Sequence, residues 1–272
     1  MSDIPQPVIV KCFCSEDDKS GNPAGVYINQ LLDDEAKQQI ASSLNLPVTV
    51  FVSDTEGAVP QIEYFYPNKK MPLCLHGTLA AAYVFFTGRK QEGMMFSTPG
   101  GKLLKLNKGV DENFEVEVCP ESVDQPSMLT LTVGADLLNI DIGDISKTSP
   151  LVVASVGSPK LLIPVSSTDT LANLNPNYLE IEKWSITNKV NGIYVYSADE
   201  ERADNFIARG FNPLTGHNED AATGVAAAAL SCQLKKSISV RQGHALGLFC
   251  EINVRYVSQL SIWVGGKVGE IS

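Results

Sequence analysis

Two short stretches of the chain combine side chains that transfer protons with a helix-forming sequence directly after them. Residues 74–78 read CLHGT, and residues 219–223 read EDAAT. Thiol, imidazole and carboxyl groups are among the side chains that general acid–base catalysis uses, and such catalysis needs a titratable group on each side of a substrate carbon. The two stretches therefore predict proton transfer, with Asp220 on one side and Cys74 or His76 on the other.

Each stretch belongs to a longer pattern that occurs twice. Phe-x-Pro precedes both stretches, at residues 65–67 and 211–213, and an Ala-rich run follows each one. Thr78 and Thr223 lie 145 residues apart, and a third pair of similar segments, GNPAGV at 21–26 and GSPKLL at 157–162, lies upstream. A repeat at about half of the 272 residues predicts two related domains, since solenoid repeats are roughly 20–50 residues long.

The Ala-rich runs predict helices over residues 77–87 and 223–234. Because each Ala presents only a methyl group, a sheet can pack closely around all sides of such a helix. We therefore expect an α+β fold with two pseudo-symmetric domains, each a central Ala-rich helix wrapped by a mixed, β-barrel-like sheet. The first domain is expected over residues 1–119, with 260–272 as a candidate final strand, and the second over 129–259. The polar segment 120–128 is the expected linker.

A helix start carries partial positive charge and backbone N–H groups without partners inside the helix. Two such starts facing one cleft would bind a small carboxylate in an otherwise acidic protein. Structural roles remain open for the same residues. Asp220 is also a favoured helix cap, as are Thr78 and Thr223. His76 could satisfy a turn carbonyl, and Cys74 could be a small buried side chain.

Composition excludes several other classes of function. The formal net charge of −10 argues against a general affinity for nucleic acid or for an anionic membrane. Residues 1–7 lack a basic signal-peptide region, and no apolar run approaches the ~20 residues of a membrane span. The six cysteines therefore indicate reduced thiols and a cytoplasmic protein. Cys12 and Cys14 lack a second ligand pair nearby, so no metal site is expected.

Four motifs resemble the signatures of the PhzF-like isomerase family of phenazine biosynthesis: residues 21–26, 74–81, 219–224 and 242–247. The resemblance runs from about residue 8 to the C-terminus. It implies the diaminopimelate-epimerase-type fold, with an active site between two domains. It also implies isomerisation of a small carboxylic acid by proton movement, no metal or organic cofactor, and a homodimer. The candidate catalytic residues are Asp220, His76 and Cys74, and the candidate substrate-binding residues are Asn22, Gly77, Thr78, Thr223, Gly224 and Val225.

The chain also departs from the family pattern. Val48 stands where the family usually carries a glutamate that acts as its acid/base, and valine cannot carry a proton. The other departures are Leu75 and Gly77 in the first motif, Lys70 before it, Ala221 and Val225 in the second domain, and Leu248 near the end.

Three interpretations fit these residues. In the first, which the sequence favours, the chain is an isomerase with a rewired proton relay. In the second, it is a family member that binds a small carboxylate without turnover, as Val48 suggests. In the third, it has an interaction or structural role, and the bulky Leu75 blocks a vestigial pocket.

Overall fold

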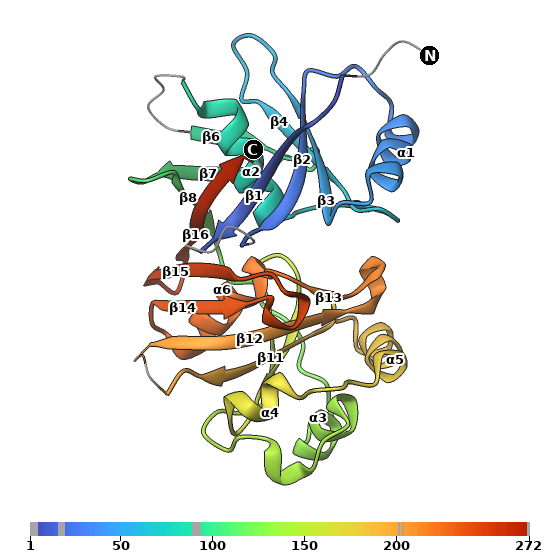
Figure 1. Ribbon diagram of the computed structural model, residues 1–272, viewed down its shortest axis with the longest axis vertical. Helices are drawn as coiled ribbons and strands as arrows, with labels where there is room; N and C mark the ends of the chain where they lie inside the picture. Colours follow the sequence, from blue (N-terminus) through green and yellow to red (C-terminus); the bar gives the residue numbers. More distant parts are fainter. Residues whose placement is uncertain (1–4, 16–19, 89–93, 201, 203, 271–272) are drawn as a thin grey trace. The chain divides into compact units, whose positions relative to one another are not determined.

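The computed structural model describes residues 5–15, 20–88, 94–200, 202 and 204–270 (Figure 1). The chain divides into two compact units. Unit 1 consists of Met1–Glu117 and Gly265–Ser272, and unit 2 of Val118–Val264. In this division the expected linker 120–128 belongs to unit 2, where the Gln125 side chain donates to the Val153 carbonyl at 2.7 Å.

The described part of unit 1 contains two helices and nine strands, and the last strand comes from the C-terminal end of the chain. The helices are α1 (Asp34–Leu44) and α2 (Leu75–Phe86). The strands are β1 (Val8–Cys14), β2 (Asn22–Ile28), β3 (Val48–Ser53), β4 (Gln61–Phe65), β5 (Lys70–Met71), β6 (Met94–Ser97), β7 (Leu103–Lys108), β8 (Asn113–Val118) and β16 (Ser261–Glu270), which crosses into unit 1 at Gly265.

The strands of unit 1 form a closed ring around α2. Their order is β1-β2-β3-β4-β6-β7-β8-β16, and β16 pairs with β1 as well as with β8. The β2–β3 and β4–β6 pairs are parallel and the β1–β2 and β3–β4 pairs antiparallel, so the sheet is mixed. Ala80, Ala81 and Ala82 of α2 are fully buried, as expected for a helix enclosed by strands.

Unit 2 contains four α-helices and seven further strands in its described part. The helices are α3 (Leu131–Leu138), α4 (Thr168–Ala172), α5 (Tyr178–Asn188) and α6 (Gly224–Leu234), with short 3-10 turns η1 (Ile142–Asp144), η2 (Pro213–Thr215) and η3 (His244–Leu246). The strands are β9 (Val152–Ala154), β10 (Lys160–Pro164), β11 (Ile193–Ala198), β12 (Asn205–Asn212), β13 (His217–Asp220), β14 (Ile238–Gln242) and β15 (Cys250–Ser258).

The sheet of unit 2 curves around α6 but does not close on the pairings seen within that unit. Its order is β9-β10-β11-β12-β14-β15, with β13 added to β12. Helix α6 contacts β9 and β10 near one end of this order and β15 at the other. A sheet whose opposite ends touch the same helix must wrap around it. The expected α+β architecture of wrapped central helices is therefore confirmed.

Strand pairing repeats between the two units. In each, a short strand (β5 or β13) lies antiparallel on the strand before the central helix, and the strand after the helix (β6 or β14) pairs parallel to that same strand. The preceding strands also match, because β2–β3 and β10–β11 are both parallel pairs. This shared order confirms the internal duplication that the sequence pattern indicated.

Strand β1 departs from regular alternation of its side chains at Phe13. Regular alternation would place Cys12 and Cys14 on the same face. Instead the register with β16 shifts between these two residues, and Phe13 adopts a left-handed φ of 61°. Such a φ is unusual for a bulky residue and fits a β-bulge. As a result Cys12 and Phe13 are both buried.

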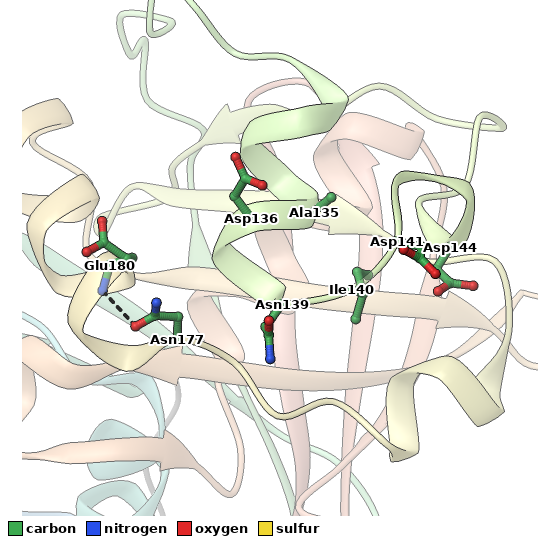
Figure 2. A pocket seen from close by; sticks show the side chains of 8 residues that line it. All are labelled: Ala135, Asp136, Asn139, Ile140, Asp141, Asp144, Asn177 and Glu180. Carbon is green, nitrogen blue, oxygen red and sulfur yellow. Dashed lines mark hydrogen bonds between the residues drawn. The ribbon is translucent and has the colours of Figure 1, made fainter.

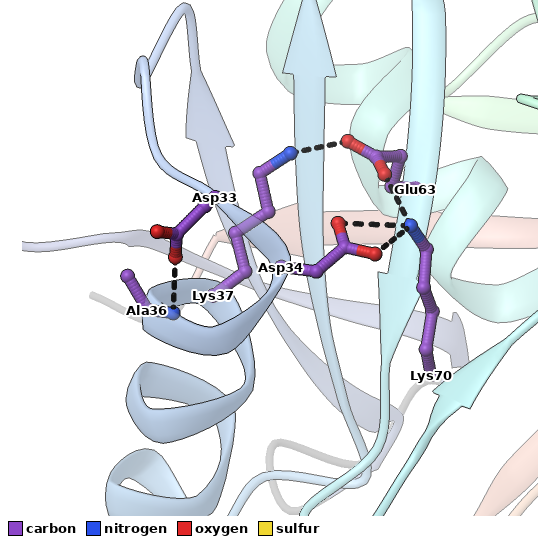
Figure 3. Close-up of polar contacts among 6 residues, drawn as sticks. All are labelled: Asp33, Asp34, Ala36, Lys37, Glu63 and Lys70. Atoms are coloured by element: carbon purple, nitrogen blue, oxygen red, sulfur yellow. Dashed lines mark hydrogen bonds and ion pairs between the residues drawn. The ribbon is translucent and has the colours of Figure 1, made fainter.

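Helix α1 is held to the sheet of unit 1 by an ion cluster (Figure 3). Glu63 of β4 pairs with Lys37 of α1 and accepts from Lys70 Nζ at 2.6 Å. Lys70 Nζ also contacts Asp34 at 2.8 Å. Lys37 and Glu63 are buried, whereas Asp34 is largely exposed. Lys70, a departure from the family pattern, therefore has carboxylate partners on both α1 and β4.

No helix in the described residues is long and apolar enough to span a membrane. All six cysteines carry free thiols.

Candidate active site

The first group of predicted residues lies at the start of α2 in unit 1. Cys74 is the N-cap residue and has extended backbone angles, so the helix begins two residues earlier than expected, at Leu75. The Cys74 thiol lies 3.3 Å from His76 Nδ1, and the hydroxyl of Tyr66 donates to Cys74 Sγ at 3.6 Å. Cys74 and His76 are both nearly buried. The structure thus brings together two of the three predicted catalytic residues.

Thr78 connects this turn to a buried tyrosine. Its hydroxyl donates to the Cys74 carbonyl at 2.8 Å, which leaves the oxygen to accept from Tyr64 Oη at 2.6 Å. Burial raises the pKa of Tyr64 far above its usual value of 10; the hydrogen bond with Thr78 opposes that shift and the charge of Cys74 adds to it. The phenol therefore stays protonated and remains a donor.

Asn22 lies in the same unit but on a strand rather than in a turn. It begins β2, is fully buried, and pairs in register with Cys12 of β1. The Cys12 thiol in turn donates to the His76 carbonyl at 3.1 Å. Asn22 is thereby linked to the start of α2 through the neighbouring strand.

Val48 and Gly77 pack against each other. Val48 begins β3 and is fully buried. A Cβ atom on Gly77 would lie 3.2 Å from Val48 Cγ1 and 2.9 Å from Val50 Cγ2. Valine at 48 and glycine at 77 are both departures from the family pattern, and they fit together sterically. The place of the missing glutamate is thus filled by apolar packing.

The second group lies at the start of α6 in unit 2. Asp220 ends β13, and its Oδ2 accepts from the Thr223 hydroxyl at 3.0 Å. Thr223 holds the N-cap position of α6 without capping it through its side chain, and Gly224 and Val225 form the first turn. Asp220 Oδ1 accepts from the Ala222 amide at 3.4 Å, so the carboxylate orders the turn before α6 without capping the helix itself.

A residue that received no role from the sequence connects this second group. Gln242, at the end of β14, is fully buried. Its Oε1 accepts from the Thr223 amide at 3.0 Å and from the Tyr194 hydroxyl at 3.2 Å. Its Nε2 donates to the Asp220 carbonyl at 2.7 Å and to Thr223 Oγ1 at 2.9 Å. Gln242 could have been noticed in the sequence because it begins the 242–247 motif. The hydrophobic periodicity of the chain does not indicate the contacts that its side chain makes.

A buried tyrosine hydroxyl serves each helix start, directly through Thr78 in unit 1 and through Gln242 in unit 2. The two tyrosines stand on opposite members of an equivalent strand pair. In unit 1 Tyr64 of β4 faces Val50 of β3, and in unit 2 Tyr194 of β11 faces Gly210 of β12. Burial raises the pKa of Tyr194 far above 10, and the nearby charge of Asp220 adds to the effect. Gly210 makes room for this arrangement, since a Cβ there would lie 2.5 Å from Thr223 Oγ1.

A separate hollow of unit 2 contains none of the predicted residues. Figure 2 shows it between α3, η1 and α5, with the carboxylates of Asp136, Asp141, Asp144 and Glu180 around it. Like charges disfavour a carboxylate ligand there. Among the residues that the structure describes, no cluster of His, Cys, Asp and Glu side chains could hold a metal ion. The helix starts remain the candidate site.

Comparison with known proteins agrees with the motifs. The model of the PhzC-PhzF family, described as phenazine biosynthesis-like protein, matches residues 10–268. An uncharacterized isomerase of Clostridium acetobutylicum is 30% identical over 259 residues, 87% of this chain and 85% of the relative. An uncharacterized isomerase of Deinococcus radiodurans is 30% identical over 274 residues, 90% of this chain and 86% of the relative. These names agree with the predicted enzyme class, an isomerase.

Solved structures support the fold. A PhzF-family phenazine biosynthesis protein of Bacillus anthracis superposes with a TM-score of 0.85 at 21% identity, over 98% of this chain and 97% of that one. A probable proline racemase of Agrobacterium radiobacter gives 0.63 at 10% identity, over 98% and 91%. With the family model matched over nearly all of its length and its fold shared with a PhzF-family structure, the chain belongs to the phenazine biosynthesis-like PhzC-PhzF family.

Proposed function

We propose that the chain is an isomerase or epimerase that moves a proton on a small carboxylic acid, without a metal or organic cofactor. One observation carries the proposal: in each unit, titratable side chains lie at the start of a buried helix, in the turn before it or in its first turn. Asp220 is held there by Thr223, and Cys74 contacts His76. The family match and the isomerase names of the relatives support the reaction class.

In the proposed reaction, the substrate binds between the two units. Its carboxylate is bound at the two helix starts, with Gly77, Thr78, Thr223, Gly224 and Val225 as the binding residues together with Asn22. The N–H groups of Thr78 and Thr223 donate to the Cys74 carbonyl and to Gln242 Oε1, so the proposed N–H donors to the carboxylate are those of Gly77, Gly224 and Val225. Helix starts favour anions because their first N–H groups lack partners within the helix. The duplicated sequence pattern supports a shared site for the two helix starts.

Asp220 is the proposed acid/base on one side of the reacting carbon, and the Cys74–His76 pair is the proposed second group. The pair replaces the acid/base that valine at position 48 cannot supply. One member removes a proton from the α- or γ-carbon, and the other returns a proton to the carbon skeleton. In D2O the acid/base groups of the enzyme carry deuterium, so the hydrogen that is returned to the carbon skeleton labels the product.

The test is deuterium incorporation from D2O into a panel of small amino, hydroxy and unsaturated carboxylic acids, followed by mass spectrometry. Wild-type protein is expected to label at least one acid. Asp220→Asn, Cys74→Ala and His76→Asn identify the groups involved, and loss of a general base lowers rates by roughly 10²–10⁴-fold. Asp136→Asn, the same type of change in the hollow of Figure 2, is the control. Wild-type labelling by both Asp220→Asn and Cys74→Ala would refute the proposed roles.

A second candidate is binding of a small carboxylate without turnover. The full burial of Val48 against Gly77 favours it, because that position offers no proton donor or acceptor. This candidate predicts saturable binding in calorimetry and no deuterium in any bound acid. Turnover of a single carboxylic acid by wild-type protein would exclude it.

The homodimer and the cytoplasmic location stay predictions. Analytical ultracentrifugation of the purified chain tests the first, and fractionation of the source cells tests the second.

A further inference from the structure

The amide of Gln242 can take only one orientation. The Thr223 N–H, which contacts Oε1, can only donate, and the Asp220 carbonyl, which contacts Nε2, can only accept. The Tyr194 hydroxyl also donates to Oε1. If Oε1 and Nε2 exchanged places, the Gln242 NH2 group would face the Thr223 N–H, and the Gln242 oxygen would face the Asp220 carbonyl. Neither pair can form a hydrogen bond, and unpaired buried polar groups lower stability. These contacts all lie within unit 2.

This orientation fixes the direction of the Thr223 hydroxyl. Gln242 Nε2 donates to Thr223 Oγ1 at 2.9 Å, so one lone pair of that oxygen is occupied. The hydroxyl proton then points to the remaining acceptor, Asp220 Oδ2, at 3.0 Å. Donors therefore align in one sense, from Gln242 through Thr223 to the carboxylate. Aligned hydrogen bonds polarise one another in a buried site.

We infer that Gln242 is a positioning residue for Asp220, acting through the Thr223 hydroxyl. It holds the Thr223 hydroxyl toward Oδ2, while Oδ1 accepts from the Ala222 amide at 3.4 Å, so the orientation of the carboxylate is fixed at both oxygens. The inference rests on the proposed function for its catalytic consequence, but the hydrogen-bond arrangement itself can be tested without substrate. In the proposed reaction, the Gln242 side chain contacts neither the substrate carbon nor the Asp220 carboxylate oxygens, and it is not itself an acid or base.

The decisive variant is Gln242→Glu, which keeps the shape of the side chain and the Oε1 acceptor. Ionised glutamate replaces the Nε2 donor by an acceptor, so the Thr223 hydroxyl turns away from Asp220. Thr223→Val removes the same hydroxyl directly. Both variants should therefore change the environment of the Asp220 carboxylate in the same direction. In the double variant, Gln242→Glu should add little to the change that Thr223→Val alone causes at the Asp220 carboxylate, because both act through the same hydroxyl.

The substrate-free readout is the side-chain 13Cγ resonance of Asp220 in protein labelled with [13C]aspartate, at pH 8. Asp220→Asn assigns the signal by its disappearance. We expect the resonance to move in Thr223→Val and in Gln242→Glu, and to stay at the wild-type position in Thr223→Ser, which restores the hydroxyl. An unmoved resonance in folded Gln242→Glu whose glutamate is ionised overturns the inference.

Gln242→Met serves if burial beside Asp220 prevents Gln242→Glu from folding or keeps the glutamate protonated, because a protonated carboxyl retains a donor. It removes the Nε2 donor at similar volume, so the Thr223 hydroxyl is no longer constrained. The resonance should move in the same direction by a smaller amount. An unmoved resonance in Gln242→Met likewise overturns the inference.

Deuterium exchange then separates this inference from the proposed function. If wild-type protein labels an acid, Gln242→Met should lower the maximal labelling rate roughly tenfold, as for one lost hydrogen bond, with little change in the half-saturating concentration. A loss confined to substrate binding overturns the positioning role. Absence of labelling in wild type refutes the proposed function alone, since the carbon resonance still decides the hydrogen-bond direction.

Discussion

At the scale of single residues, the site depends on small side chains that let the helix starts approach their sheets. Gly77 lies over Val50, Val48 and Tyr64, and Gly210 lies under Thr223 and Gln242. Neither glycine needs a left-handed φ, so their role is close approach rather than a special turn. A side chain at position 210 would displace Thr223, which the proposed chemistry uses, and a side chain at position 77 would press on Val50 and push the start of α2 away from its sheet.

Gly77→Ala is expected to lower the free energy of unfolding by about 1–3 kcal/mol, because the new Cβ would lie 2.9 Å from Val50 Cγ2. The gain in helix propensity from alanine, up to about 1 kcal/mol, offsets part of this cost. Urea titration of wild type, Gly77→Ala, Val50→Ala and the double variant measures it. The cost of Gly77→Ala should shrink in the Val50→Ala background, and an equal cost in both backgrounds would contradict the packing account.

Sequence alone predicted the polar residues of both helix starts, since their types and spacing are visible locally. It did not give Gln242 or the two buried tyrosines a role. Tyr194 lies 48 residues from Gln242, and Gln242 lies 19 from Thr223. Contacts across such separations depend on strand pairing and register, which local pattern does not determine. The two tyrosines also stand on non-equivalent strands of the duplicated units, so the repeat in the sequence does not align them with each other.

At the scale of elements, helix α1 depends on the buried ion cluster of Figure 3. Burial alone would raise the pKa of Glu63, but hydrogen bonds and charges from Lys37 and Lys70 outweigh it and hold that pKa below 4.5. A carboxyl group with a lowered pKa in the folded state stabilises the protein above its unfolded pKa. That contribution is lost as pH falls through the lower, folded value.

Glu63→Gln is expected to cost roughly 3–5 kcal/mol at pH 7, because it leaves the Lys37 ammonium buried without a carboxylate. The difference in unfolding free energy between wild type and this variant should narrow as pH falls below 4.5. Asp34→Asn, which removes the exposed carboxylate on Lys70, is the control and should cost about 0–1 kcal/mol. Equal urea midpoints for the two variants would contradict a structural role for the cluster.

Among the elements, the Ala-rich helices were predicted because their composition is both helix-forming and uniformly apolar. Helix α3 was not predicted. It has only eight residues, LTVGADLL, and its Thr, Val and Gly have low helix propensity. Its N-cap Thr130 accepts from the Val133 amide at 3.3 Å, and Ala135, Leu137 and Leu138 are buried in the core of unit 2. Tertiary burial therefore outweighs local preference in this segment.

At the scale of the whole molecule, the last strand ties the two ends of the chain together. β16 begins in unit 2, and from Gly265 onward belongs to unit 1, where it pairs with β1. A Cβ on Gly265 would lie 2.1 Å from the Phe114 carbonyl of β8, whereas a Cβ on Gly269 would meet nothing within 4 Å. The ring of unit 1 thus closes at a position that accepts only glycine.

Gly265→Ala is expected to destabilise unit 1 by about 3 kcal/mol or more, since rigid backbone cannot move aside. Hydrogen–deuterium exchange with mass spectrometry should show lost protection in β1 and β8, with α6 retaining its protection. Gly269→Ala is the control in the same strand and should resemble wild type. If Gly265→Ala lost protection equally in both units, the result would contradict this prediction, because unit 1 would not then open separately from unit 2.

The central claim is proton transfer at Asp220, and deuterium incorporation from D2O into a small carboxylic acid tests it most directly. The account predicts that wild-type protein adds one deuterium per turnover to at least one acid, and that Asp220→Asn labels that acid roughly 10²–10⁴-fold more slowly. Undiminished labelling by Asp220→Asn, or no labelling of any acid by wild-type protein, would contradict the account.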